Sequence, residues 1–178
     1  MTLHVLARGL LAGLTLTLSM SLPSYACERS ESSEEAAVDG EIDKAIDTVR
    51  LARRAGWPEP LVRLVGALAM AETRGYNERV GDRRLENEKW GPSVGLTQLR
   101  TLRSQTGTGG PRDIERISDP LENMRAALEL YRGGRFDVGG ETYYEPGGAE
   151  QWSTYTSGAY KDFVPLIERA MGLQGRVR

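Results

Sequence analysis

The sequence predicts a mainly α-helical protein with a single folded domain and few or no short strands. Apolar residues recur at the three- and four-residue spacing of helices in several segments, whereas runs of alternating apolar and polar residues are scarce. Glycine and proline residues separate these segments. The chain has 178 residues, which is enough for one domain with a hydrophobic core of its own.

The first 26 residues have the layout of a secretory signal peptide. His4 and Arg8 precede a short apolar core, and Ser24 and Ala26 supply small residues before a cleavage site after Ala26. The apolar core is short for a membrane span. We therefore expect an exported protein, located in the periplasm, in the cell envelope or outside the cell.

Cys27 is the only cysteine, so no disulfide can form within the chain. It follows the expected cleavage site directly, where bacterial lipoproteins carry an acylated cysteine. Ser24 and Tyr25 differ from the residues that are usual before such a cysteine. Two outcomes remain open, namely a lipoprotein attached to the membrane through Cys27 and an ordinary cleaved chain with a free thiol.

Residues 27–40 are rich in serine and glutamate and contain few large apolar side chains. This composition predicts a disordered acidic linker ahead of a domain over residues 41–178. From residue 48 onward basic residues slightly outnumber acidic ones, and most of them are arginines. The weak positive charge suits an anionic cell wall and is too small to indicate a nucleic-acid partner.

The first two predicted helices occupy the start of the domain. One ends at Gly56-Trp57-Pro58, and the next runs from about Glu59 to Ala71. Residues 73–92 are polar and rich in turn formers, so we expect a loop there. Residues 94–104 suit either a helix or a short strand that leads into one, and a glycine-rich break follows. The apolar residues of the first helix are Ile42, Ala45, Ile46, Val49 and Ala52, and those of the second are Leu61, Leu64, Val65, Leu68 and Ala69.

Two more helices are predicted in the second half of the chain. Ser118 or Asp119 is expected to cap a helix that begins near Pro120. Residues 132–148 contain many glycines and are expected to form a long loop. A last helix is expected over about residues 160–171, with Pro165 either kinking it or delaying its start.

Glu72 stands at the end of the second predicted helix, directly after an apolar run. A glutamate at a helix end is more often a solvated surface charge. Here, apolar neighbours and the partial negative charge of a helix C-terminus would both raise the pKa of its carboxyl group. A carboxyl group that stays protonated near neutral pH can donate a proton to a glycosidic oxygen. Glu72 is therefore the candidate general acid.

Two later segments carry groups that suit a sugar-binding cleft. In WGPSVGLTQL, Gly95 allows the backbone to approach a ligand closely, and Gln98 offers an uncharged donor and acceptor for hydroxyl and acetamide groups. In WSTYTSGAYKDF, the side chains of Trp152, Tyr155 and Tyr160 offer flat faces. Taken alone, the first segment is better explained by an ordinary glycine-containing turn before a helix, and core or surface aromatics explain the second segment as well as a sugar-binding role does.

Together, these segments over about residues 61–166 resemble the catalytic domain of the soluble lytic transglycosylases, which belong to the lysozyme-like superfamily with the goose-type lysozymes. AMAETRGYN resembles the family's helix that ends in Glu-Ser-Gly-aromatic-Asn, which implies that Glu72 is the catalytic acid. SVGLTQL is similar to the family's Ser-x-Gly-Leu-x-Gln block, which implies that Ser93, Gly95 and Gln98 line the cleft.

The resemblance extends to two later motifs. DPLENMRAALELY corresponds to the segment in which Asn123 helps to order the substrate-binding site, and WSTYTSGAY resembles the last motif, in which Tyr155 would face Glu72. The chain departs from the family pattern at Thr73, where serine is commoner, and at TYTSG, where Ala-Tyr-Asn-Ala-Gly is common. The glycine-rich stretch 137–148 is an additional segment. The implied fold is a lysozyme-like single domain with a cleft.

The resemblance implies cleavage of the β-1,4 bond between N-acetylmuramic acid (MurNAc) and N-acetylglucosamine (GlcNAc) in peptidoglycan. A lytic transglycosylase uses one glutamate and leaves 1,6-anhydro ends. No cofactor or metal is expected, since the only histidine, His4, lies in the signal peptide and Cys27 is the only thiol. The expected form is a monomer that acts on glycan strands.

Two alternatives stay open at this point. Asp82, in the loop after Glu72, could act as a second carboxylate that activates water, which would make the protein a lysozyme-type hydrolase. Because Asp82 lies among Arg79, Arg83 and Arg84, a surface ion pair explains it equally well. The other alternative is a non-catalytic module that binds the wall through the same cleft. A role in a secretion or conjugation apparatus would use the same lytic activity, and the sequence does not decide it.

Overall fold

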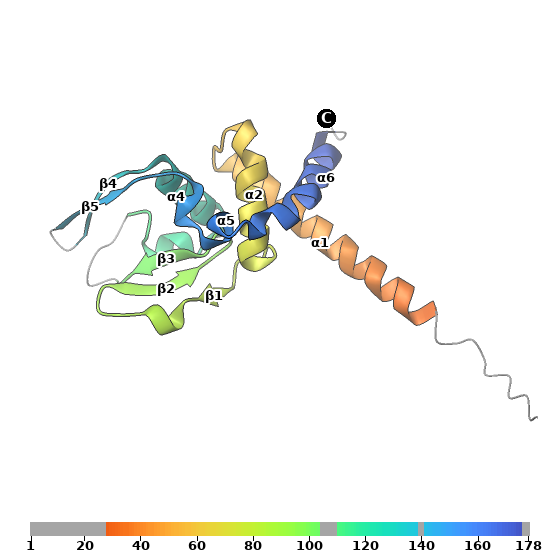
Figure 1. Cartoon of the computed structure of the whole chain (residues 1–178), viewed down its shortest axis with the longest axis horizontal. Coiled ribbons are helices and arrows are strands. Elements are labelled where there is room, and N and C mark those ends of the chain that lie inside the picture. Colours follow the sequence, from red (N-terminus) through yellow and green to blue (C-terminus); the bar gives the residue numbers. More distant parts are fainter. Residues whose placement is uncertain (1–27, 104–109, 139–140, 176–178) are drawn as a thin grey trace, which may run out of the picture.

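Helices dominate the fold, as predicted. The computed structural model describes residues 28–103, 110–138 and 141–175, so the expected signal peptide and Cys27 lie outside the described residues. No helix in this described part of the chain is long and apolar enough to span a bilayer. The frame of the molecule consists of α1 (Glu28–Arg54), α2 (Glu59–Thr73), α4 (Pro120–Arg132) and α6 (Val164–Gly175) (Figure 1).

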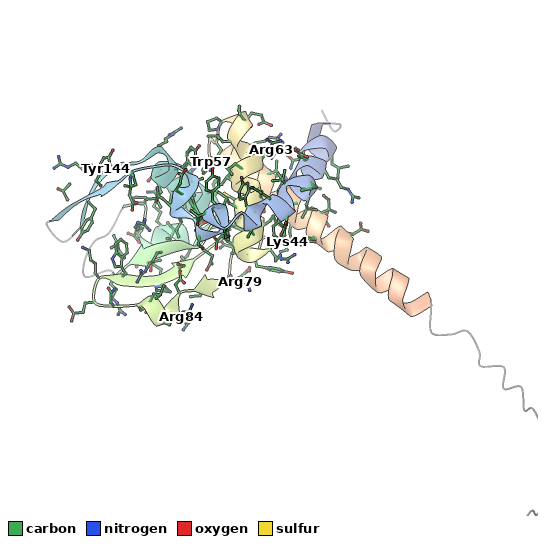
Figure 2. The ribbon with its side chains drawn as sticks, in the orientation of Figure 1. Lys44, Trp57, Arg63, Arg79, Arg84 and Tyr144 are labelled. Atoms are coloured by element: carbon green, nitrogen blue, oxygen red, sulfur yellow. The ribbon has the colours of Figure 1, made fainter. Side chains whose placement is uncertain are left out.

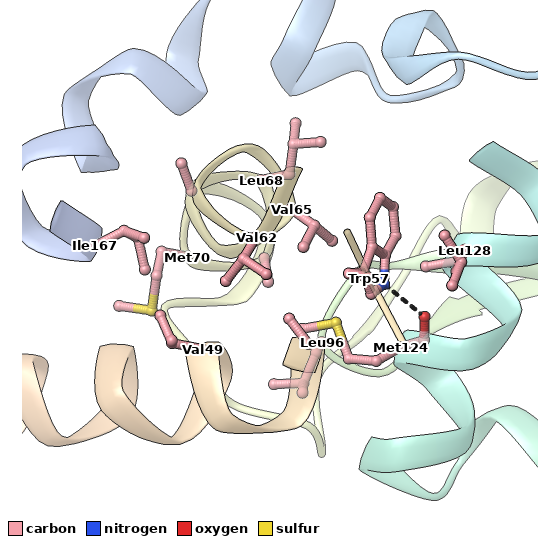
Figure 3. Packing of buried hydrophobic residues seen from close by; sticks show 14 of the residues in the cluster. Val49, Trp57, Val62, Val65, Leu68, Met70, Leu96, Met124, Leu128 and Ile167 are labelled. Atoms are coloured by element: carbon pink, nitrogen blue, oxygen red, sulfur yellow. Dashed lines mark hydrogen bonds between the residues drawn. The ribbon is translucent and has the colours of Figure 1, made fainter. Parts of the chain in front are cut away.

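The hydrophobic core surrounds α2 (Figure 3). Apolar side chains cover this helix along most of its length, and it packs against both α1 and α6. Trp57, in the turn before α2, donates a hydrogen bond of 3.0 Å from Nε1 to the carbonyl oxygen of Met124 on α4. Burial of each large apolar side chain contributes about 1.5–3 kcal/mol. The core therefore fixes the position of α2, and with it the helix end that carries Glu72. Fully buried large side chains of this core include Val49, Val62, Val65, Leu68, Met70, Met124 and Ile167.

The acidic segment 28–40 forms the beginning of α1 in the structure, where the sequence predicted a disordered linker. Glutamate and alanine are good helix formers, and acidic residues near a helix N-terminus interact favourably with the helix dipole. Figure 1 shows this part of α1 projecting away from the remaining elements. The first buried residue described in α1 is Ile42, and Ala45 and Val49 continue the buried side.

A small antiparallel sheet follows α2, and its strands are β1 (Val80–Gly81), β2 (Trp90–Val94) and β3 (Leu99–Leu102) in that order. The prediction that residues 73–92 form only a loop is wrong, because β1, the 3₁₀ helix η1 (Arg83–Leu85) and the start of β2 lie there. The strand β2 contains Gly91 and Pro92, two residue types that are uncommon in strands, so the sequence did not indicate it.

Gly91 is needed in β2 for a steric reason: a Cβ at this position would lie 2.4 Å from Oγ1 of Thr101 on β3. For residues 94–104, the strand alternative is correct over Leu99–Leu102, and a turn precedes it.

Residues 132–148 contain a hairpin, so the prediction of a long loop is wrong here too. The antiparallel strands β4 (Gly134–Val138) and β5 (Glu141–Glu145) pair with Arg135 opposite Tyr144. In the sequence, two glycines at 139–140 separate runs that contain aromatic and β-branched residues, a pattern typical of a tight hairpin. The glycine content concealed this pattern.

The predicted start of α4 is confirmed, with Asp119 as its cap. The Asp119 carboxylate accepts hydrogen bonds of 2.9 Å from the backbone N–H groups of both Leu121 and Glu122, and Pro120 is the first helical residue. The last helix, α6, begins at Val164, so Pro165 in its first turn delays the start and does not kink the helix. The short elements are α3 (Ile114–Ile117), η2 (Ala149–Gln151), α5 (Ser153–Thr156) and η3 (Ala159–Phe163).

Candidate active site

Glu72 lies in the last turn of α2, one residue before the helix ends. Arg74 then adopts a left-handed conformation with φ of 57°, and its N–H donates a hydrogen bond of 2.8 Å to the carbonyl oxygen of Met70. This is a common way to end a helix, and it turns the chain towards β1. The carboxyl group of Glu72 is therefore held at the boundary between the core and the surface.

Thr73 ties this helix end to the segment between β2 and β3. It is fully buried, and its hydroxyl lies 3.0 Å from the carbonyl oxygen of Ala69 and 3.2 Å from that of Leu96. Threonine therefore supplies the hydroxyl that serine would supply at this position. The contact with Leu96 fixes the distance between Glu72 and the segment that contains Gly95 and Gln98.

The pKa of the Glu72 carboxyl group is raised above its ordinary value. Burial is the largest cause, because it disfavours the charged form, and the negative charge of Asp82 acts in the same direction. Thr154 on α5 opposes both effects, since its Oγ1 donates a hydrogen bond of 2.7 Å to Oε1 of Glu72. Desolvation dominates this balance. Glu72 therefore keeps its proton to a higher pH than an exposed glutamate does, and it has one fixed neighbour that orients the carboxyl group.

Glu72 opens into a cleft of about 660 Å³. Residues of α2, the three-stranded sheet and the segment just before α5 line this cleft, together with Leu130 of α4. Its size and mixed polar and aromatic lining suit a carbohydrate chain. The lining residues are Glu72, Asp82, Leu85, Trp90, Ser93, Gln98, Leu99, Arg100, Arg112, Leu130, Gln151, Trp152 and Ser153.

Asp82 is the second carboxylate in the cleft. Its backbone is left-handed, with φ of 55°, and its Oδ2 accepts a hydrogen bond of 2.6 Å from Oγ of Ser93. None of the neighbouring arginines forms an ion pair with it among the residues that the structure describes. The surface-ion-pair interpretation is therefore wrong for this carboxylate. Ser93, which was predicted to line the cleft, does so, and it also holds Asp82 in place.

Gln98 lines the cleft with its amide nitrogen already engaged. Its Nε2 donates hydrogen bonds of 2.9 Å to the carbonyl oxygen of Arg79 and 3.1 Å to that of Gly95. The residue also has a positive φ of 47°. A Cβ on Gly81 would lie 2.4 Å from Oε1 of Gln98. Gln98 therefore fixes the loop between Glu72 and Asp82, and it presents its carbonyl oxygen near β1.

Asn123 and Gly95 lie behind the cleft and do not line it. The Asn123 side chain is fully buried; its Oδ1 accepts hydrogen bonds from the N–H and the hydroxyl of Thr97, and its Nδ2 donates to the carbonyl oxygens of Val94 and Ile117. Gly95 has φ of +75°, and a Cβ there would lie 2.2 Å from Nδ2 of Asn123. Both residues shape the segment between β2 and β3, and a buried Asn123 side chain cannot contact substrate.

Tyr155 forms no hydrogen bond with Glu72 among the residues that the structure describes. Its ring stacks on that of Tyr160 with the centroids 5.2 Å apart, and it packs against the hydrophobic core. The preceding residue, Thr154, makes the contact with the catalytic candidate instead. The resemblance identified the correct segment, but the residue that faces Glu72 is one position earlier.

Several cleft residues were not singled out by the sequence, among them two arginines, a tryptophan and a glutamine. Trp90 and Arg100 lie on the small sheet, Arg112 lies before α3, and Gln151 lies before α5. Gln151 Nε2 donates a hydrogen bond of 2.7 Å to the carbonyl oxygen of Leu130. A sequence signal exists only for Trp90, since a tryptophan next to a glycine-proline pair in a polar stretch is unusual. The arginines are too common in this chain to stand out.

The described part of the chain contains no group of three or more histidine, cysteine, aspartate or glutamate side chains that could hold a metal ion. The arrangement instead offers one desolvated carboxyl group, one solvated carboxylate and several neutral donors and acceptors. These are the groups required for acid–base chemistry on a sugar.

Comparison with known families agrees with this geometry. A family model described as a lysozyme-like domain matches residues 49–136. The match includes Glu72, Asp82 and the segment that contains Gln98, and it ends before Thr154. No curated protein and no solved structure gives a significant match to the chain. A lysozyme-like domain indicates a glycosidase-type activity related to peptidoglycan.

Proposed function

We propose that this chain, whose residues 49–136 belong to the lysozyme-like domain family, is a lytic transglycosylase. It would cleave the β-1,4 bond between MurNAc and GlcNAc in peptidoglycan. The observation that carries the proposal is Glu72, a desolvated carboxyl group with a raised pKa that opens into a cleft of carbohydrate size. The family match alone supports only the coarser statement, a peptidoglycan-related glycosidase.

In the proposed reaction, Glu72 first donates its proton to the glycosidic oxygen as the bond to the muramic acid C1 breaks. Positive charge develops at C1, and the resemblance implies that the substrate's own acetamide group stabilises it. The 6-hydroxyl of the same sugar then attacks C1. The Glu72 carboxylate takes the proton of that hydroxyl and is ready for another cycle, so no water is consumed. The product carries a 1,6-anhydro ring.

Two contacts support this role for Glu72. The Thr154 hydroxyl donates a hydrogen bond to Oε1 of Glu72, and the backbone N–H of Thr154 also interacts with this carboxyl group, so Thr154 orients it. Thr73 anchors the helix end on the segment between β2 and β3. A general acid has to be held within hydrogen-bond reach of the oxygen that it protonates, and these contacts restrict the motion of the carboxyl group.

A second candidate function is lysozyme-type hydrolysis, and Asp82 favours it. This carboxylate lines the same cleft, its charge raises the pKa of Glu72, and Ser93 holds it by a hydrogen bond. In a hydrolase, Asp82 would activate a water molecule that attacks C1 from the face opposite the leaving group. In a transglycosylase, Asp82 would instead keep Glu72 protonated and contact sugar hydroxyl groups.

Mass spectrometry of the muropeptides released from purified peptidoglycan distinguishes the two functions. Cyclisation adds no water to the cleaved fragments, whereas hydrolysis adds one. We expect anhydro-muropeptides as the main product, both from the wild type and, at a lower rate, from Asp82→Asn. Reducing-end products that disappear in Asp82→Asn would establish the hydrolase instead.

We also propose that the protein is exported and that its mature chain begins at Cys27. The layout of residues 1–26 supports export, and a location in the cell envelope would bring the domain to its substrate. The intact mass of the protein recovered after export tests both parts. A mass that starts at Cys27 supports cleavage, an added diacylglyceryl group identifies a lipoprotein, and retention of residues before Cys27 contradicts the proposed site.

A further inference from the structure

Arg100 on β3 lines the cleft without a carboxylate partner. Its guanidinium group donates one hydrogen bond, to the carbonyl oxygen of Leu85, and its Nε is buried without a hydrogen-bond partner. No carboxylate among the described residues forms an ion pair with it within 4.0 Å. A guanidinium group has five N–H donors; apart from the buried Nε donor and the one that binds Leu85, the remaining donors on Nη1 and Nη2 have no partner among the described residues and can bind an acceptor.

The second arginine of the cleft, Arg112, is neutralised. Its Nε and Nη2 donate hydrogen bonds of 2.8 and 2.6 Å to Oε1 of Glu145 on β5, and the two side chains are only 13% and 15% exposed. Its Nη1 donates a hydrogen bond of 3.0 Å to the backbone carbonyl of Arg100. Arg112 therefore fastens β3 to the hairpin and fixes the backbone of Arg100, while the charge of Arg100 itself stays uncompensated.

Trp90 fixes the guanidinium groups from the side of β2. The Cζ atoms of Arg100 and Arg112 lie 5.7 and 5.2 Å from the centroid of its ring. Contact of a guanidinium group with a tryptophan ring is favourable, and it leaves the N–H donors free to bind in the plane of the group. A planar carboxylate is the anion that such a fork binds with two parallel hydrogen bonds.

Arg100 is also close to the reacting groups. It is the direct cross-strand partner of Ser93, and such partners project from the same face of the sheet. Ser93 holds Asp82, whose charge acts on Glu72. A ligand group that reaches Arg100 therefore belongs to a sugar near the bond that Glu72 cleaves.

We propose that Arg100 binds a carboxylate of the glycan strand, carried by a muramic acid residue near the scissile bond, and so selects anionic peptidoglycan over neutral strands. This inference rests on the proposed function of the same cleft. Two sources supply the carboxylate: the lactyl group of muramic acid that has lost its peptide, and the peptide of muramic acid that has kept it. Arg112 and Trp90 are positioning residues for this contact.

The test compares Arg100→Gln with the wild type on three substrates. The first is glycan strands with their peptides, the second is strands freed of peptide by an amidase, and the third is a methylamide preparation of each of these two kinds, in which the carboxylates are converted. Arg84→Gln is the matched control, because Arg84 is exposed on η1 outside the cleft lining (Figure 2) and its replacement changes the net charge equally.

We expect Arg100→Gln to raise KM by about tenfold on strands with free carboxylates, the effect of losing a charge-assisted hydrogen bond. On methylamide strands it should match the wild type, and Arg84→Gln should match the wild type on every substrate. An effect confined to one kind of strand identifies the lactyl group or the peptide as the source. An equal loss on carboxylate and methylamide strands would overturn the proposal, because Arg100 would then act only through its bond to Leu85.

Binding without turnover separates this proposal from the proposed function. Titration calorimetry with the Glu72→Gln variant and soluble peptide-free strands should show tighter binding of carboxylate than of methylamide strands. Adding Arg100→Gln should abolish that preference, and adding Arg100→Lys, which keeps the charge, should retain part of it. If the preference is present but the wild type cleaves no strand, the proposed function fails and the subsite stands. If cleavage proceeds but the preference is absent, the subsite alone fails.

Discussion

Replacement of Asn123 by alanine should destabilise the domain, because this side chain is a buried hub of hydrogen bonds. It satisfies the N–H and the hydroxyl of Thr97 and the carbonyl oxygens of Val94 and Ile117, all at 2.8–3.1 Å. Each of these bonds contributes about 1 kcal/mol, so Asn123→Ala should lower the free energy of unfolding by about 4 kcal/mol. For a domain of this size, that corresponds to a fall in Tm of about 10 °C.

The assay is thermal unfolding followed by circular dichroism, with urea unfolding to obtain the free energy. Asn77→Ala is the control, since the Asn77 side chain donates a single hydrogen bond, of 2.7 Å to the carbonyl oxygen of Ser118, and should cost about 1 kcal/mol. If Asn123→Ala changes Tm by no more than Asn77→Ala does and instead raises KM, then Asn123 contacts substrate. The conclusion drawn from its burial would be refuted.

Three further predictions concern the cleft. Thr154→Val removes the hydroxyl hydrogen bond that favours the charged form of Glu72, so the pKa of Glu72 should rise and the fall of kcat/KM at high pH should move to higher pH. Asp82→Asn removes a negative charge near Glu72, so the pKa of Glu72 should drop and the same fall of kcat/KM should move to lower pH. If both variants shifted this fall in the same direction, the account would be contradicted. The raised pKa of Glu72 means that its charged form is unfavourable in the folded state, so the stability of the domain should fall as the pH rises through that pKa. Glu72→Gln should therefore have a higher Tm than the wild type at neutral pH, and the difference in Tm should vanish at low pH. Gln98→Ala should lower the stability by about 2 kcal/mol through its two hydrogen bonds to backbone carbonyls, in addition to lowering kcat, and an unchanged urea midpoint would show that those bonds contribute nothing.

The parts of the fold that the sequence predicts correctly are those that depend on local patterns. Apolar residues at helical spacing located α2 and α6, and an aspartate before a proline located the start of α4. Glu72 stood out because a charged residue at the end of an apolar run is locally unusual. These signals lie within a few residues of each other in the chain.

The features that were missed depend on contacts between distant residues. The pairing of β2 with β3 and the ion pair between Arg112 and Glu145, which are 33 residues apart, have no local signal. The choice between Thr154 and Tyr155 as the neighbour of Glu72 depends on the rotation of α5, and the stacking of Tyr155 on Tyr160 contributes to that rotation. A family motif identifies such a segment, but only tertiary packing decides which of its side chains contacts Glu72.

The central claim, that Glu72 is the acid that cleaves the glycan strand, is tested most directly by muropeptide release from purified peptidoglycan. Wild type and Glu72→Gln are compared at equal concentration, and thermal unfolding verifies that the variant is folded. Glutamine keeps the shape of the side chain and can still accept the hydrogen bond from Thr154, but it has no proton to donate. The account predicts soluble 1,6-anhydro muropeptides from the wild type and a rate at least ~10²-fold lower for the variant. Release by Glu72→Gln at the wild-type rate, or no release by the wild type, would contradict it.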